Sequence, residues 1–253
     1  MTSVSAKAGQ AAITALAWLC AIGIPIPLVV GDTPEPNGLT VHNKGMGGQN
    51  TEQGRARFEK DVVALKPDYV FTYFGLNDTL NEPKFVTLER FIANLGWMVD
   101  QARAAGIKPV LCTIHRVIEE PLLKRHKRES YGSEGPNGKI ARYNAAIRKL
   151  TREKSVPLVD FAEVVAVASR DHPNTNIIWP DGVHLTPDGN RLLAKCFLDT
   201  VASQLTGKET IVCLGDSVTY GSGSKTAGTA EGETYPAFLR HARIAARSDK
   251  QLK

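Results

Sequence analysis

The sequence has few of the residues that build metal and redox sites. Its 253 residues include only four cysteines, and these lack the close pairing that binds zinc or a cluster. They are Cys20, Cys112, Cys196 and Cys213. Cys112 and Cys213 stand in apolar runs, where cysteine usually behaves as a small buried hydrophobe. We therefore expect no metal and no cofactor, and the cysteines do not require an oxidising compartment.

Signatures of nucleotide and nucleic-acid binding are also missing. The glycine-rich stretch 43–51 has neither the G-x-G-x-x-G pattern nor the Lys-Ser/Thr of a P-loop. The basic excess is small, 31 Lys and Arg against 26 Asp and Glu. Its densest part, residues 124–128, has beside it no aromatic side chains that could stack on bases and no known nucleic-acid-binding motif. We interpret that part as a solvated loop and expect no nucleic-acid partner.

Only one long apolar run occurs, near the N-terminus at residues 11–30. It can be the core of a signal peptide, since Lys7 precedes it and a small-residue motif lies inside it. It can also be a buried helix over 8–22 followed by an extended segment, and we favour this slightly because two prolines interrupt the run. The same prolines argue against a membrane span. Residues 1–38 are thus an apolar extension of uncertain role, and localisation stays open between cytoplasmic and secreted.

The remainder, residues 39–253, alternates predicted strands and helices and has no linker or internal repeat. Hydrophobic residues at 42% and charged residues at 23% are typical of a soluble globular protein. The strands are predicted at 39–42, 69–74, 109–114, 156–160 and 211–214, and the main helices at 52–65, 85–105, 139–154, 161–169, 187–204 and 235–246. Such alternation predicts one α/β domain with a mostly parallel sheet covered on both faces. The stretch 115–138 is predicted to be a long binding loop or lid.

The apolar strand 211–214 runs directly into Gly215-Asp216-Ser217. A serine just after a central strand faces the sheet edge where ligands of open α/β sheets bind. The same tripeptide is also an ordinary turn. On this stretch alone, a nucleophile and a turn are equally good interpretations.

Three other predicted loops at the same sheet edge carry polar residues. Gly48 follows one strand, Asn77 follows another, and Asp181 and His184 share a third loop. Acyl transfer needs such a set, because a serine hydroxyl requires a base and the histidine requires a carboxylate that fixes its tautomer. The Ser217 and Gly48 N–H groups and the Asn77 amide could stabilise the oxyanion.

Four short blocks of this sequence contain the residues just named: Gly215-Asp216-Ser217-Val218-Thr219, Gly47-Gly48-Gln49-Asn50-Thr51, Gly75-Leu76-Asn77-Asp78 and Asp181-Gly182-Val183-His184. They resemble the four signature blocks of the SGNH, or GDSL-type, hydrolases. The resemblance implies a flavodoxin-like three-layer αβα sandwich with a five-stranded sheet. It also implies Ser217 as nucleophile, His184 as base and Asp181 as its partner. Ser217, Gly48 and Asn77 would form the oxyanion hole.

The order of the blocks departs from that family. The serine block usually comes first, whereas here it follows the Asp-x-x-His block. We therefore expect a circularly permuted chain. Residues 205–210 would connect the two segments that form the chain ends in the usual topology of the family. Chain ends that lie close together tolerate such rewiring. Whether the permutation is natural is left open.

Three further residues are tentative substrate-binding candidates. Asp216 adjoins the serine, His115 follows a strand at the same edge, and Trp179 precedes the Asp-x-x-His block. A structural role is at least as good an interpretation of His115, and core packing is as good for Trp179. The adjacent pair Asp171-His172 is interpreted as surface loop, because neighbouring residues orient each other poorly.

The resemblance and the polar loops favour a serine esterase for short acyl groups, especially acetyl esters on carbohydrate. Its partner would be a small-molecule or carbohydrate ester, and a membrane partner is not expected. Lipase, thioesterase or arylesterase activity on small substrates stays open. A catalytically inactive binding module of the same fold is the alternative from another class. Oligomeric state is not predicted.

Overall fold

The computed structural model describes residues 38–171 and 176–242, which belong to one compact unit, Asp32–Lys253. Their strands form a five-stranded sheet in the order β1-β5-β2-β3-β4, with every pair parallel. The strands are β1 (Thr40–Gly45), β2 (Tyr69–Tyr73), β3 (Lys108–Cys112), β4 (Leu158–Val159) and β5 (Thr210–Gly215). The predicted α/β fold with a parallel five-stranded sheet is confirmed. The extension 1–38, with its predicted helix, lies almost wholly outside the described residues, as does His172.

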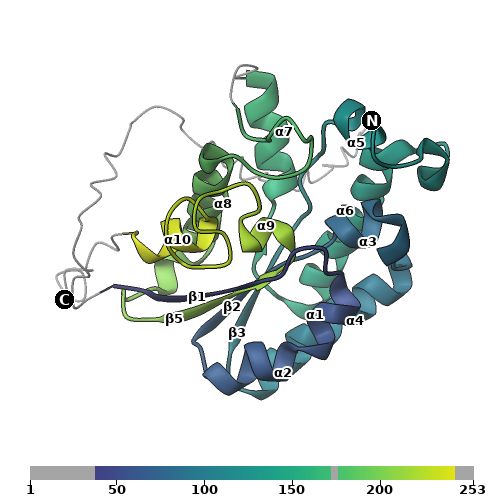
Figure 1. Cartoon of the computed structure of the whole chain (residues 1–253). Helices are drawn as coiled ribbons and strands as arrows, with labels where there is room; N and C mark the ends of the chain where they lie inside the picture. The colour runs from purple at the N-terminus through teal and green to yellow at the C-terminus, as the bar shows by residue number, and fades with distance from the viewer. Residues whose placement is uncertain (1–37, 172–175, 243–253) are drawn as a thin grey trace, which may run out of the picture. The chain divides into compact units, whose positions relative to one another are not determined.

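Helices cover both faces of this sheet (Figure 1). The α-helices are α1 (Thr51–Ala56), α2 (Phe58–Asp61), α3 (Leu76–Leu80), α4 (Leu88–Ala104), α5 (Glu119–Leu123), α6 (Gly135–Lys154), α7 (Phe161–Asp171), α8 (Pro187–Val201), α9 (Ser217–Tyr220) and α10 (Tyr235–Arg240). Short 3₁₀ turns are η1 (Val63–Leu65), η2 (Glu82–Lys84), η3 (Arg128–Tyr131) and η4 (Ala202–Gln204). In Figure 1, α8 and α10 lie on one side of the sheet, and α1, α2 and α4 lie on the other. No helix in the described ranges is long and apolar enough to cross a membrane.

Alternate residues of the central strands pack on opposite faces, as the pleat of a strand requires. Phe71 of β2 stacks on Phe197 of α8 with ring centroids 4.6 Å apart, and Phe197 stacks in turn on Tyr235 of α10 at 5.5 Å. On the other face, Val70 and Phe74 join a cluster that contains residues of α2 and α4. Strands buried on both faces read as continuous apolar runs, which is why β2 and β5 are recognisable in the sequence.

Several local predictions need correction. The helix expected over 52–65 is broken at Arg57 into α1 and α2, followed by η1. Its N-cap is Asn50: the Asn50 side chain accepts from Gln53 N, and the Gln53 side chain accepts from Asn50 N, which together form a capping box. The stretch 115–138 is not a simple loop, because it contains α5, η3 and the start of α6.

Counting the strands from β5 gives a familiar topology. If β5 is strand 1, then β1, β2, β3 and β4 become strands 2 to 5, and the sheet order reads 2-1-3-4-5. This is the flavodoxin-like order of doubly wound sheets, whose ligands bind at the switch point beside strand 1. The switch point here lies at the carboxyl end of β5, between β1 and β2.

Candidate active site

Ser217 begins helix α9 directly after the central strand β5, with Asp216 as the N-cap. Asp216 Oδ1 accepts a hydrogen bond from Val218 N at 2.9 Å, which fixes the turn. Gly215 leaves no room for a side chain, since a Cβ there would lie 2.4 Å from the Tyr73 carbonyl oxygen and 2.0 Å from Thr219 Oγ1. The glycine therefore lets α9 fold back tightly, and it places the Ser217 hydroxyl at the sheet edge.

His184 lies at the end of a small hairpin before α8. The hairpin is closed by the antiparallel bridge between Ile178 and Leu185, and Trp179 N donates to the His184 carbonyl at 2.8 Å. Thr186 then caps α8, accepting from Gly189 N, and proline occupies the first turn, a combination typical of helix starts. The imidazole thus projects from a segment held by both hairpin and helix.

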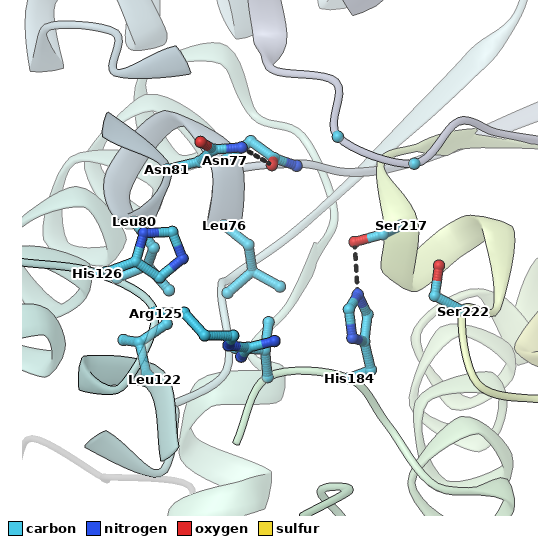
Figure 2. A pocket seen from close by; sticks show the side chains of 13 residues that line it. Leu76, Asn77, Leu80, Asn81, Leu122, Arg125, His126, His184, Ser217 and Ser222 are labelled. Atoms are coloured by element: carbon cyan, nitrogen blue, oxygen red, sulfur yellow. Dashed lines mark hydrogen bonds between the residues drawn. The ribbon is translucent and has the colours of Figure 1, made fainter. Parts of the chain in front are cut away.

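A continuous chain of hydrogen bonds joins Asp181, His184 and Ser217 (Figure 2 shows its last link). The Ser217 hydroxyl donates to His184 Nε2 over 2.9 Å, and His184 Nδ1–H donates to Asp181 Oδ2 over 2.5 Å. Asp181 Oδ1 also accepts from the backbone N–H groups of Val183 and His184. Burial alone would raise the pKa of Asp181, but the ring hydrogen bond and these two N–H groups outweigh it and hold that pKa well below its usual range. The carboxylate is therefore ionised beside the imidazole.

Gly48 and Asn77 face the same space from the loops after β1 and β2. Gly48 has φ +72°, a left-handed conformation that glycine adopts without strain. Asn77 Nδ2 donates to the Gln49 carbonyl at 3.0 Å, and Asn77 Oδ1 accepts from Asn81 Nδ2 at 3.1 Å. Because a primary amide carries two N–H groups, one remains for a ligand.

These residues line one cavity of about 310 Å³. Its polar lining consists of Gly47, Gly48, Asn77, Asn81, Ser217 and Ser222. Its apolar lining consists of Leu76, Leu80, Leu122 and Val183. The remaining lining residues are basic: Arg125, His126 and His184. The structure therefore brings together Ser217, His184, Gly48 and Asn77, with Asp181 behind His184.

The three tentative substrate-binding residues do not line this cavity. Asp216 is fully buried as the cap of α9. His115 is also fully buried: its Nδ1 accepts from the Tyr73 hydroxyl and its Nε2–H donates to the Val183 carbonyl at 2.8 Å. Burial lowers the pKa of His115 to about 4, so the ring is neutral. Trp179 is partly buried, and its ring lies close to Gly223.

Sequence reasoning missed the basic wall of the cavity. Arg125 and His126 belong to the basic stretch that was interpreted as a solvated loop. The length of the segment 115–138 predicts a binding loop or lid, but it does not indicate which of its side chains line a cavity. Charge does not identify them either, since neighbouring lysines and arginines of the same stretch do not line the cavity.

Two carboxyl groups are buried beneath the site, and each has an Oδ2 atom without a partner among the described residues: Asp216 and Asp78. Burial raises the pKa of Asp216 to about 7, the bond from Val218 N lowers it, and the nearby Asp78 carboxylate raises it further. Burial likewise raises the pKa of Asp78 to about 6, against the hydrogen bonds from Thr51. Within the described ranges, no group of three or more His, Cys, Asp or Glu side chains is placed to hold a metal ion.

The chain belongs to the GDSL-like lipase/acylhydrolase family, whose model matches residues 29–192. It is 35% identical over 178 residues to the uncharacterized lipoprotein YqeF of Bacillus subtilis, covering 64% of this chain and 73% of that protein. A crystal structure of an acetyl xylan esterase matches at TM-score 0.52 and 26% identity, over 62% of this chain and 78% of the other. A GDSL-like lipase from Bacteroides thetaiotaomicron matches at TM-score 0.54 and 26% identity, over 64% of this chain and 75% of the other. The protein is thus a carboxylic ester hydrolase.

We predict that Asp216 makes the protein less stable as pH rises through the range from about 4 to about 7. In this range the unfolded chain has released the Asp216 proton while the folded protein keeps it, so unfolding releases a proton and becomes more favourable as pH increases. For one such group, the free energy of unfolding falls by at most about 1.4 kcal/mol per pH unit. Urea unfolding of the wild type and Asp216→Asn should show the free energy of unfolding of the wild type falling relative to the variant across this range. A difference in the free energy of unfolding between the two proteins that stays constant with pH would contradict the prediction.

Proposed function

We propose that Ser217, His184 and Asp181 are the catalytic triad of this hydrolase. The observation that carries the proposal is the hydrogen-bond chain between the three side chains, which joins segments 33 residues apart in the sequence. A serine hydroxyl becomes a nucleophile when a neutral imidazole accepts its proton. An ionised carboxylate on the far nitrogen fixes the tautomer and stabilises the imidazolium that forms.

The reaction proceeds through an acyl-enzyme. Ser217 Oγ attacks the ester carbonyl carbon while its proton passes to His184 Nε2. The tetrahedral intermediate collapses as the carbon–oxygen bond to the alcohol breaks, and His184 returns the proton to the departing oxygen. Water then attacks the acyl-enzyme with His184 as base, which releases the carboxylic acid and restores the Ser217 hydroxyl.

The oxyanion hole in this proposal consists of the Ser217 and Gly48 N–H groups and the Asn77 side-chain amide. Support comes from the common cavity and from the bonds of Asn77 to Gln49 and Asn81, which fix the amide before substrate binds. Donors that are held in place need no reorganisation as negative charge develops.

Short acyl esters, acetyl groups on carbohydrate above all, are the proposed substrates. The cavity volume of about 310 Å³ is near the lower end of the range for ligand pockets, which favours a small acyl group. The acetyl xylan esterase among the structural neighbours supports the choice of acetyl. The four apolar side chains that line the cavity of this protein could also contact a slightly longer acyl chain or an aromatic ring. Arylesterase and thioesterase substrates are therefore the alternatives.

We also propose that the chain is circularly permuted within its family. The sheet order 2-1-3-4-5 counted from β5 supports this, as does the end of the family match at residue 192, before Ser217. The bridge between α8 and β5 is well ordered by hydrogen bonds, since Glu209 accepts from the N–H groups of Thr206 and Gly207. A short, hydrogen-bonded bridge fits a natural junction between two former chain ends.

Replacing the proposed nucleophile should remove activity. We expect Ser217→Ala to lower kcat on p-nitrophenyl acetate by at least about 10³-fold and to abolish labelling by a fluorophosphonate probe. Mass spectrometry of the labelled wild type should locate the adduct on Ser217. Ser222, the second hydroxyl of the cavity, provides the matched control, because Ser222→Ala should still be labelled at Ser217. Labelling that survives in Ser217→Ala would refute the triad, and a wild type that is neither labelled nor active would favour the binding module.

The size of the cavity predicts a preference for short acyl chains. Among p-nitrophenyl acetate, butyrate and octanoate, kcat/KM should fall as the chain lengthens, because a cavity of about 310 Å³ must hold both the acyl chain and the alcohol part of the ester. Acetylated xylo-oligosaccharides should release acetate under the same conditions. A rise in kcat/KM toward octanoate would instead indicate a lipase.

The permutation predicts that the chain tolerates a new start within the bridge. A variant that runs from residue 206 to 253 and continues through 1 to 205 keeps every described strand–helix unit intact. We expect it to fold cooperatively and to be labelled at the same serine, whereas a chain cut inside β2 should not fold. Failure of the chain cut in the bridge to fold would contradict the prediction.

A further inference from the structure

Arg125 lines the cavity, and its guanidinium has no carboxylate partner among the described residues. Three of its neighbours in the basic stretch do have such partners: Lys124 pairs with Glu120, His126 with Glu82, and Arg128 with Glu119. Arg125 instead donates from Nη2 to the main-chain carbonyl of Asp181 at 2.6 Å. Glu82, Glu119 and Glu120 are therefore paired with other side chains.

The position of Arg125 is fixed by the segment that carries it. Leu122, at the end of α5, is buried, and its carbonyl accepts from Arg125 N at 3.0 Å. The segment is docked on the loop of the proposed catalytic pair, because Ile118 N donates to the Gly182 carbonyl at 2.9 Å. In Figure 2 the Arg125 side chain reaches from the side of Leu122 and His126 toward His184.

The chemistry of the cavity favours a negatively charged group near Arg125. No aspartate or glutamate is among the lining residues, whereas Arg125 carries a permanent positive charge. A guanidinium presents five N–H donors in a planar fork that matches a carboxylate, and the bond to Asp181 leaves most of them available. The apolar lining residues Leu76, Leu122 and Val183 would contact the carbon atoms of the same ligand.

We propose that Arg125 is a specificity residue that binds a carboxylate carried by the ester substrate. This inference rests on the proposed function, because it concerns a substrate held beside Ser217. The carboxylate can belong to the acyl part, as in a dicarboxylic acid half-ester, or to the alcohol part, as in an acetylated uronic acid.

A purely structural role of Arg125 is the competing explanation. The bond to the Asp181 carbonyl could serve only to hold the loop that bears the Asp181 carboxylate. Such a role would affect charged and neutral esters equally. The ratio of kcat/KM for a charged ester to kcat/KM for its neutral isostere separates the two explanations.

The experiment uses the full chain and two matched substrate pairs. One is p-nitrophenyl hemisuccinate and its methyl ester, and the other is acetylated glucuronic acid and its methyl ester. In the wild type, we expect kcat/KM to be about tenfold higher for the charged member of at least one pair, mainly through KM. Arg125→Gln should bring this ratio close to one, and Arg125→Lys should keep part of it, since lysine retains the charge without the fork.

Lys127→Gln is the control, because it removes a positive charge from the same segment at a side chain that does not line the cavity. Its ratio should equal that of the wild type. Raising the ionic strength from about 0.02 to about 0.5 M should lower the wild-type ratio. The pair that shows the preference identifies the part of the substrate that carries the charge.

Three outcomes would overturn the proposal. Ratios near one in the wild type for both pairs would do so while leaving the hydrolase proposal intact, provided that Ser217 is labelled and neutral esters are cleaved. An equal loss on charged and neutral esters in Arg125→Gln would assign the residue a structural role. Absence of turnover and of labelling would overturn the proposed function, and this inference with it.

Discussion

The parallel pairing of β5 with strands on both of its sides determines where the site can form. β5 pairs with β1 along one edge and with β2 along the other, and Gly215 is in register with Gly45 and with Tyr73. The loops that follow the three strands must therefore emerge together at the carboxyl edge of the sheet. These loops carry Ser217, Gly48 and Asn77. Loss of this pairing would separate the proposed nucleophile from its oxyanion donors, whatever their local conformation.

Arg57 reinforces that arrangement from beneath the loops. Its guanidinium donates to the carbonyl groups at the ends of two adjacent strands, Lys44 at 2.7 Å and Gly215 at 2.8 Å. It also bonds to the Gln49 side chain and forms a buried ion pair with Asp61. The Gly215 carbonyl also accepts from Met46 N at 3.1 Å, so Arg57 adds a second, charged donor at this point. One side chain thus satisfies the backbone of two strands and fixes the loop that contains Gly48.

Much of this fold follows from patterns that are local in the sequence, and most of the errors arise where tertiary contacts decide. Strands β2 and β5 are apolar on both faces and can be recognised without tertiary context. The start of α8 is equally recognisable, because Thr186 is followed directly by a proline. Asn50 and Thr51 are both good N-cap residues by type, and tertiary contacts decide between them: Asn50 caps α1, whereas Thr51 bonds to the buried Asp78. β4 is only two residues long, although five were expected.

The candidate site shows the same division. The four polar blocks could be predicted to converge because each follows a strand or precedes a helix, and the structure does bring them together, while their catalytic roles stay proposals. The sequence contained no sign that His115 would be enclosed in the core and bonded to Tyr73. The Arg125 guanidinium bonds to a backbone carbonyl, and only the three-dimensional structure reveals such a contact.

The buried acid Asp216 shows how stability and function interact at this edge. An uncompensated carboxyl group in the core destabilises the fold as it ionises, so a merely structural cap would be better served by serine or threonine. Aspartate at this position keeps a titratable group directly before Ser217, with Asp78 close enough to raise its pKa. Strain and unsatisfied groups of this kind concentrate at functional sites, because a surrounding structure that is otherwise well packed can tolerate them. The continuous stack of Phe71, Phe197 and Tyr235, three fully buried rings, contributes to that packing.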